Sequence, residues 1–85
     1  MDTIITNLQN EIKKRAAFVN RIIEAIDSKK AKMDWDSKEQ VNELETLRDT
    51  YTHAENTLGH LRRALVSLRR ARGEKNIDVF YPENF

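Results

Sequence analysis

The chain has no cysteine, one proline and two glycines among its 85 residues. The lack of cysteine excludes disulfides, thiolate zinc sites and a thiol nucleophile. No apolar run approaches the roughly 20 residues that are needed to cross a bilayer. The first residues also lack the basic stretch and continuous apolar stretch of a secretory signal. We therefore expect a cytoplasmic protein without membrane contact.

Patterns that carry catalytic chemistry are also missing. Isolated glycines cannot form a loop that cradles phosphate groups, and no spacing of serine, histidine and carboxylate residues marks a catalytic triad. His53 and His60 would lie about 10 Å apart along a helix axis, which is too far for one metal ion. We predict that the protein is not an enzyme and has no catalytic residues, metal site or cofactor.

The scarcity of turn-forming residues and the abundance of Leu, Ala, Glu, Lys and Arg indicate long helices. Apolar residues recur in steps of three and four along residues 3–32 and again along residues 37–72. Only residues 33–36 separate these segments, and so short a connection predicts an antiparallel pair. The expected fold is an all-α two-helix hairpin over residues 1–73, followed by a separate C-terminal tail over residues 74–85.

The heptad positions also predict how the two helices face each other. Facing residues should have numbers that sum to about 73, which places Ile12 near Leu61 and Ala16 near Gly59. A glycine inside a helix costs about 1 kcal/mol relative to alanine. We expect Gly59 to be there because small residues let the two backbones approach closely.

Several residues mark the ends of the predicted helices. Asp2 is a candidate N-cap of the first helix, and Asp36 with Glu39 has the spacing of a capping box at the second. Gly73 is a typical helix stop, because glycine adopts the left-handed conformation without a Cβ clash. Trp35, the only tryptophan, either covers the open end of the bundle or serves as an exposed anchor for a partner.

A hairpin of this kind leaves part of its apolar surface uncovered. Ala16, Ile23 and Val41 lie beside the seam between the helices, and so small a scaffold needs further burial. We therefore expect a homo-oligomer, a dimer or higher, in the form of a four-helix bundle or a larger coiled coil. The predicted oligomer core consists of Ile5, Leu8, Ile12, Val19, Ile22, Ile23, Ile26, Val41, Leu44, Leu47, Tyr51, Leu58, Leu61, Leu65 and Leu68.

Arginines gather near the end of the second helix, where they form a stripe beside the apolar seam. Such a stripe is a candidate site for an acidic partner or for phosphate groups. The alternative is a solvated helix end that complements the helix dipole and pairs with Asp2 or Glu11. The stripe consists of Arg62, Arg63, Arg69, Arg70 and Arg72.

The tail is unusually rich in apolar and aromatic residues. Pro82 stops it from continuing as a helix, and the alternation of Ile77, Val79 and Tyr81 favours an extended, strand-like path. Three outcomes stay open: the tail folds back over a flank of this chain or a neighbouring subunit, docks into a partner, or is disordered. The predicted contact residues are Ile77, Val79, Phe80, Tyr81 and Phe85.

The last third of the chain resembles a known family. Leu58, Leu61, Ala64 and Ala71, followed by "VFYPEN", are similar to the last helix and proline-containing tail of phage helical-hairpin proteins that sequester cyclic-nucleotide signals of bacterial antiphage immunity. The aromatic residue of that family's helix is replaced here, with Ser67 near its place. The resemblance implies an oligomer that holds a nucleotide-type anion between subunits.

The leading functional expectation is a non-catalytic, oligomeric interaction protein, a small phage or bacterial regulator or inhibitor that binds a macromolecular partner such as a host protein. One alternative is sequestration of a nucleotide-type anionic signal at an arginine-lined site between subunits. Another is RNA or DNA binding by the basic end of the hairpin, which is less favoured because the net charge is only +1.

Overall fold

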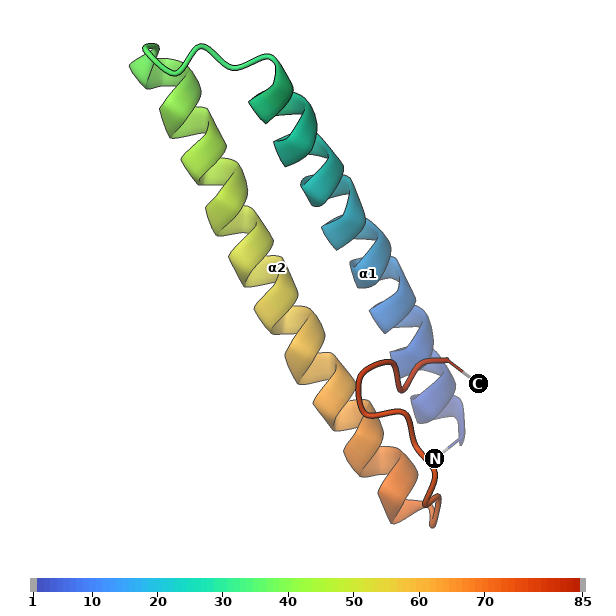
Figure 1. Cartoon of the computed structure of the whole chain (residues 1–85). Coiled ribbons are helices and arrows are strands. Elements are labelled where there is room, and N and C mark those ends of the chain that lie inside the picture. Colours follow the sequence, from blue (N-terminus) through green and yellow to red (C-terminus); the bar gives the residue numbers. More distant parts are fainter. Residues whose placement is uncertain (1, 85) are drawn as a thin grey trace.

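The computed structural model describes residues 2–84, which form two long helices and a C-terminal tail. Helix α1 spans Asp2–Ala31 and helix α2 spans Lys38–Ala71, so each end lies one residue from its predicted position. The helices run antiparallel as a rod with extents of 55 × 20 × 17 Å, and the tail lies in the half of the rod that is opposite the turn (Figure 1). The predicted all-α hairpin is confirmed.

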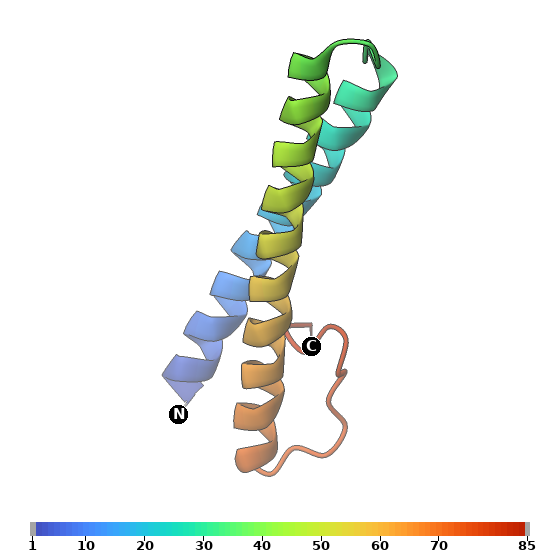
Figure 2. The same ribbon diagram turned by 90° about the vertical axis from the view of Figure 1, so that its left-hand side faces the viewer.

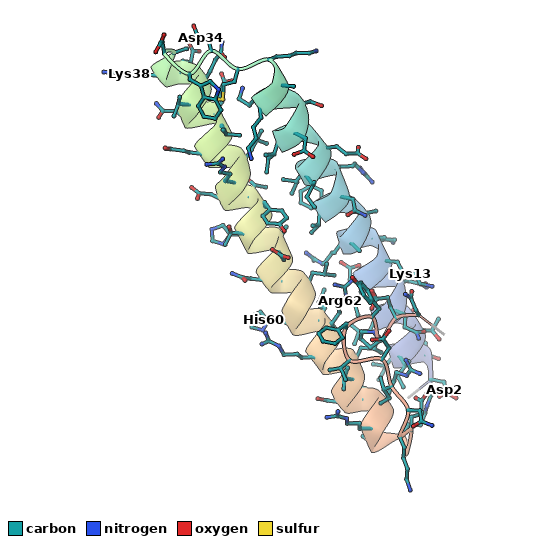
Figure 3. The ribbon with its side chains drawn as sticks, viewed as in Figure 1. Asp2, Lys13, Asp34, Lys38, His60 and Arg62 are labelled. Atoms are coloured by element: carbon teal, nitrogen blue, oxygen red, sulfur yellow. The ribbon has the colours of Figure 1, made fainter. Side chains whose placement is uncertain are left out.

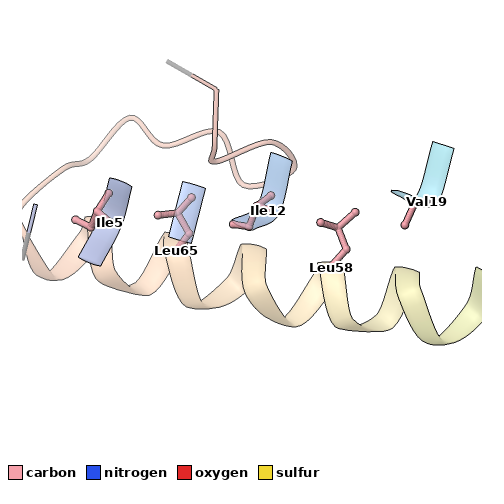
Figure 4. Close-up of a cluster of buried hydrophobic side chains, with 5 residues drawn as sticks. All are labelled: Ile5, Ile12, Val19, Leu58 and Leu65. Carbon is pink, nitrogen blue, oxygen red and sulfur yellow. The ribbon is translucent and has the colours of Figure 1, made fainter. Parts of the chain in front are cut away.

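The seam between the helices has the register that the heptads predict. Ile12 lies between Leu65 and Leu58 along the rod, and Val19 lies beyond Leu58 (Figure 4). Ion pairs near both ends of the hairpin agree with this register, because Lys29 contacts Glu43 and Arg72 contacts Asp2. The buried apolar core consists of Ile5, Ile12, Val19, Ile22, Leu44, Leu58, Leu65 and Val66.

The first turn of α2 differs from the predicted capping box by one residue. Ser37, not Asp36, is the N-cap, and its hydroxyl accepts from the backbone N–H of Gln40 at 3.3 Å. The carboxylate of Asp34 accepts from the backbone N–H of Asp36, which tightens the turn. Sequence alone did not separate these choices because a serine and an aspartate are adjacent at the helix start, and both residue types make good N-caps.

Two further expectations near the helix ends are wrong. Asp2 is the first residue of α1 rather than its N-cap, and its Oδ1 accepts from Nη1 of Arg72 at 2.7 Å. Trp35 does not cover the end of the hairpin, because it is 62% exposed in the turn. Among the described residues, no helix is long and apolar enough to cross a membrane.

Gly59 does not mark a close approach of the two helices. A Cβ atom built there would meet only Nη2 of Arg63, at 3.9 Å, so space is open beside the α2 backbone. The predicted packing reason for this glycine is therefore absent within the described chain. Gly59 instead lines a surface groove, which is described below.

Candidate docking surface

The tail begins at a glycine that ends α2. Gly73 has φ of 99°, and the backbone N–H groups of Gly73 and Glu74 donate to the carbonyl oxygens of Arg70 and Arg69. This is a Schellman motif, which needs the left-handed conformation that glycine adopts most easily. The motif confirms the predicted helix stop. It also turns Glu74 back over the last turn of α2.

Glu74 joins the start of the tail to two arginines. Its carboxylate accepts from Nε and Nη2 of Arg69, at 3.1 and 2.8 Å, and from Nη2 of Arg72 at 2.7 Å. The Arg69 guanidinium is the main reason that the pKa of Glu74 lies below its ordinary value; Arg72 adds to this effect, and desolvation opposes it. The pKa of Arg72 is raised by Asp2 first and by Glu74 second. These charges stabilise each other in the folded chain.

Beyond this point the chain reverses and returns along one side of the hairpin (Figure 2). The carboxylate of Asp78 accepts from the backbone N–H groups of Phe80 and Tyr81, at 2.9 and 3.1 Å. In an Asx turn of this kind, a side-chain oxygen takes the place of a backbone carbonyl oxygen as the hydrogen-bond acceptor. This turn and the bend at Val79 and Phe80 interrupt the extended path that was predicted along Ile77, Val79 and Tyr81. The fold-back over a flank of the hairpin is confirmed.

Pro82 and Glu83, which we call the tail anchor, hold the returning segment. Pro82 is fully buried and Glu83 is buried. Nε and Nη2 of Arg62 donate to Oε1 of Glu83 at 3.1 and 2.7 Å, and Nη1 of Arg69 donates to the carbonyl oxygen of Pro82. Figure 3 shows Arg62 pointing toward the tail, whereas His60 points away from it. The anchor therefore fastens the tail to the arginine stripe.

The residues that the anchor leaves outside form an apolar surface. Val79, Phe80 and Tyr81, which we call the tail face, are 57%, 80% and 52% exposed. The guanidinium carbon of Arg62 lies 5.0 Å from the centroid of the Tyr81 ring, in a cation–π arrangement that holds this ring in place. Among the other predicted tail contacts, Ile77 is half-buried, and Phe85 lies outside the described residues.

A groove of about 740 Å³ continues from the tail along the seam. Small residues line it, with Ala16 and Ala17 on α1 and Gly59 on α2, and so do Tyr81 and Asn84 of the tail. Ile23 borders the groove and is 38% exposed. Tyr51 also lines it, and the carboxylate of Glu55 raises the pKa of the Tyr51 hydroxyl by favouring its protonated form.

The structure divides the arginine stripe into two groups. Arg62, Arg69 and Arg72 are paired with carboxylates of the tail or of α1. Arg63 and Arg70 are exposed on α2 and form no ion pair within residues 2–84. The predicted pairing with Asp2 occurs through Arg72, whereas Glu11 pairs with Arg15 of its own helix.

Most predicted oligomer-core residues are buried or half-buried within one chain. Leu8, Ile26, Val41, Leu47, Tyr51, Leu61 and Leu68 are half-buried. Ile23 remains exposed beside the groove. No group of histidine and carboxylate residues within the described chain is placed to hold a metal ion.

Sequence reasoning did not identify the residues that fasten the tail. The sequence did not single out Glu74 or Glu83 as partners of the arginine stripe, because single acidic residues in a tail are common. A usable signal was present, however: acidic residues flank the aromatic segment, and they follow a helix end rich in arginine. Comparison of the chain with protein-family models, with curated proteins and with solved structures gives no match. The function is therefore inferred from the residues and their contacts.

Proposed function

We propose that the protein is a non-catalytic interaction protein, a small regulator or inhibitor that binds a macromolecular partner through the tail face. One observation carries this proposal: three consecutive apolar or aromatic residues, Val79, Phe80 and Tyr81, are each more than half exposed on a tail whose next two residues are buried. Aromatic residues that fill pockets of a partner provide much of the binding energy in protein interfaces.

The way in which the tail is held supports this role. Glu74 fastens it on one side of the tail face, and Pro82 with Glu83 fastens it on the other. A segment that is already held in one conformation loses less conformational entropy when it binds. The tail face is thus an ordered surface rather than a free peptide.

Anionic ligands find less support as the primary partners. A nucleotide or nucleic acid needs several uncompensated cations, and only Arg63 and Arg70 of the five stripe arginines lack an ion pair within residues 2–84. The paired arginines would have to exchange their carboxylates for the ligand, which reduces the net gain.

We also propose self-association through the groove. A second copy would cover Ile23, and it would give Gly59, which faces open space beside α2, a close packing partner. Small residues at a helix surface allow another helix to approach, and a hairpin with a single seam gains burial by pairing with a copy of itself.

A photo-crosslinking experiment tests the proposed partner. A photoreactive phenylalanine analogue replaces Phe80 in the full chain, and a matched variant carries it at the exposed position Glu45 in α2. The proposal requires a protein that is crosslinked only from position 80. Unlabelled chain must compete for this crosslinking, and the purified protein must bind the purified chain in a reconstituted assay. Phe80→Ser should weaken that binding about tenfold or more, as expected for a central aromatic contact. The proposal would be contradicted if the protein were crosslinked equally from positions 80 and 45, or if Phe80→Ser left its binding unchanged.

A further inference from the structure

The surface beneath the tail contains an unusual set of buried hydrogen-bond donors. Gln9 and Arg69 are each only 6% exposed, and the side chain of Arg62 is 21% exposed. The amide Nε2 of Gln9 has no hydrogen-bond partner. Buried polar groups in folded proteins are usually satisfied, so an unpaired donor indicates a missing acceptor. We call Gln9, Arg62 and Arg69 the donor cradle.

The register places these residues on one flank of the hairpin. Gln9 precedes Ala16 by one heptad, and Ala16 lines the groove together with Arg62. Arg69 follows Arg62 by one heptad on α2. All three therefore continue the groove toward the end of the rod where the tail lies. The tail supplies acceptors to the two arginines: the Glu83 carboxylate to Arg62, and the Pro82 carbonyl oxygen and the Glu74 carboxylate to Arg69.

From this arrangement we infer that the donor cradle is a binding site for an acidic peptide segment of a partner protein, which the chain's own Pro82–Glu83 segment occupies in the free state. The inference rests on the proposed function only in that the chain binds a protein. A segment in the cradle would displace the anchor, so it would bind the released state of the tail and not the held tail face. The guanidinium groups of Arg62 and Arg69 make the cradle basic, and Glu74 compensates only part of that charge, so the cradle favours an acceptor-rich segment. The fork of Arg62 fits a carboxylate in two-point contact.

The tail and the partner segment would compete for the same donors. A segment attached by a short connection has an effective concentration in the millimolar range, so an external peptide binds weakly until the tail is released. The apparent affinity falls in proportion to the fraction of molecules in which the cradle is open. Gly73 allows that release, because it separates the tail from α2 and has no contact at its Cβ position.

The test uses full-length chains and a labelled peptide with the sequence of residues 76–84, NIDVFYPEN. Glu83→Gln removes the charge of the chain's own anchor and leaves the cradle intact. Fluorescence anisotropy should show saturable binding of the peptide to Glu83→Gln, with affinity at least tenfold higher than to the wild-type chain. The same peptide with glutamine at its glutamate position should bind at least tenfold more weakly. A scrambled peptide of equal charge measures the contribution of charge alone.

Two further variants of the chain test whether the peptide binds at the cradle. Adding Arg62→Gln to Glu83→Gln should abolish the binding, whereas adding Arg70→Gln, which changes an exposed arginine of α2, should leave it unchanged. Circular dichroism verifies that each receptor keeps its helices, and Glu83→Ala replaces Glu83→Gln as the open receptor if the latter unfolds. The inference is overturned if neither open receptor binds the peptide more tightly than the wild type, or if the scrambled peptide binds equally well. Such a failure would leave the crosslinking result at Phe80 untouched, so the two proposals can be separated.

Discussion

Arg62 and Glu83 are 21 positions apart, yet Nη2 of Arg62 donates to Oε1 of Glu83 at 2.7 Å. The side chain of Glu83 is almost completely buried in this pair. The contact closes the tail over the flank of the hairpin and leaves the tail face exposed on its outer side. Folding thus converts a basic helix end and an acidic tail into one surface.

The first prediction concerns this pair. Glu83→Gln should release the tail while the hairpin stays folded, because the tail contacts the hairpin through only a few residues. A hydrogen bond to a charged group contributes about 1.5–3 kcal/mol, and every 1.4 kcal/mol changes an equilibrium tenfold. Chymotrypsin cleavage after Phe80 should therefore become about tenfold faster. Glu24→Gln, at an exposed position of α1, is the control. Equal cleavage rates in both variants would contradict the anchoring role.

The second prediction contrasts the two glycines. Gly73→Ala should destabilise the protein by about 1 kcal/mol, because alanine adopts a positive φ poorly. Gly59→Ala should stabilise it by up to about 1 kcal/mol, since alanine favours a helix and its Cβ would meet only a flexible arginine at 3.9 Å. Urea unfolding measures both values. A loss of stability in Gly59→Ala at a concentration where the chain is monomeric would contradict the open space beside α2.

The third prediction concerns acid stability. The pKa of Glu74 is lowered in the folded chain, chiefly by Arg69. A carboxyl group with a depressed folded pKa stabilises the fold above its unfolded pKa, and that contribution is lost as the pH falls through the folded pKa. The stability advantage of the wild type over Glu74→Gln should be constant near neutral pH and should shrink below the ordinary glutamate pKa of 4.5. Urea unfolding between neutral and acidic pH checks this, and a pH-independent difference would show that the charge of Glu74 is irrelevant.

The fourth prediction concerns the buried amide of Gln9. Gln9→Leu should raise the free energy of unfolding by about 1 kcal/mol, because it removes a buried donor that lacks a partner. Asn10→Leu, at the neighbouring exposed position, should change stability by no more than about 0.5 kcal/mol. Thermal and urea unfolding of both variants provide the comparison. A marked destabilisation by Gln9→Leu would mean that the amide is satisfied in solution.

The fifth prediction tests self-association. Sedimentation velocity of the wild-type chain should show a concentration-dependent oligomer, and Ile23→Glu should shift it toward the monomer because a charge would be buried in the proposed interface. Ala25→Glu, at an exposed position that does not line the groove, should leave the association unchanged. A wild-type chain that stays monomeric at all concentrations would exclude this proposal.

The sequence by itself determined the hairpin. Its heptads specify two helices and their register, because apolar residues at helical spacing must face each other to leave water, and Gly73 specifies where α2 ends. Only the tertiary structure decided the burial of Gln9, Val66 and Arg69, which lie outside the predicted core. Arg69 donates to the Pro82 carbonyl oxygen of the tail, whose path is set by an Asx turn, a proline and an ion pair to a residue 21 positions away. Periodicity describes one helix face at a time, so it carries no information about an irregular segment that returns to cover that face.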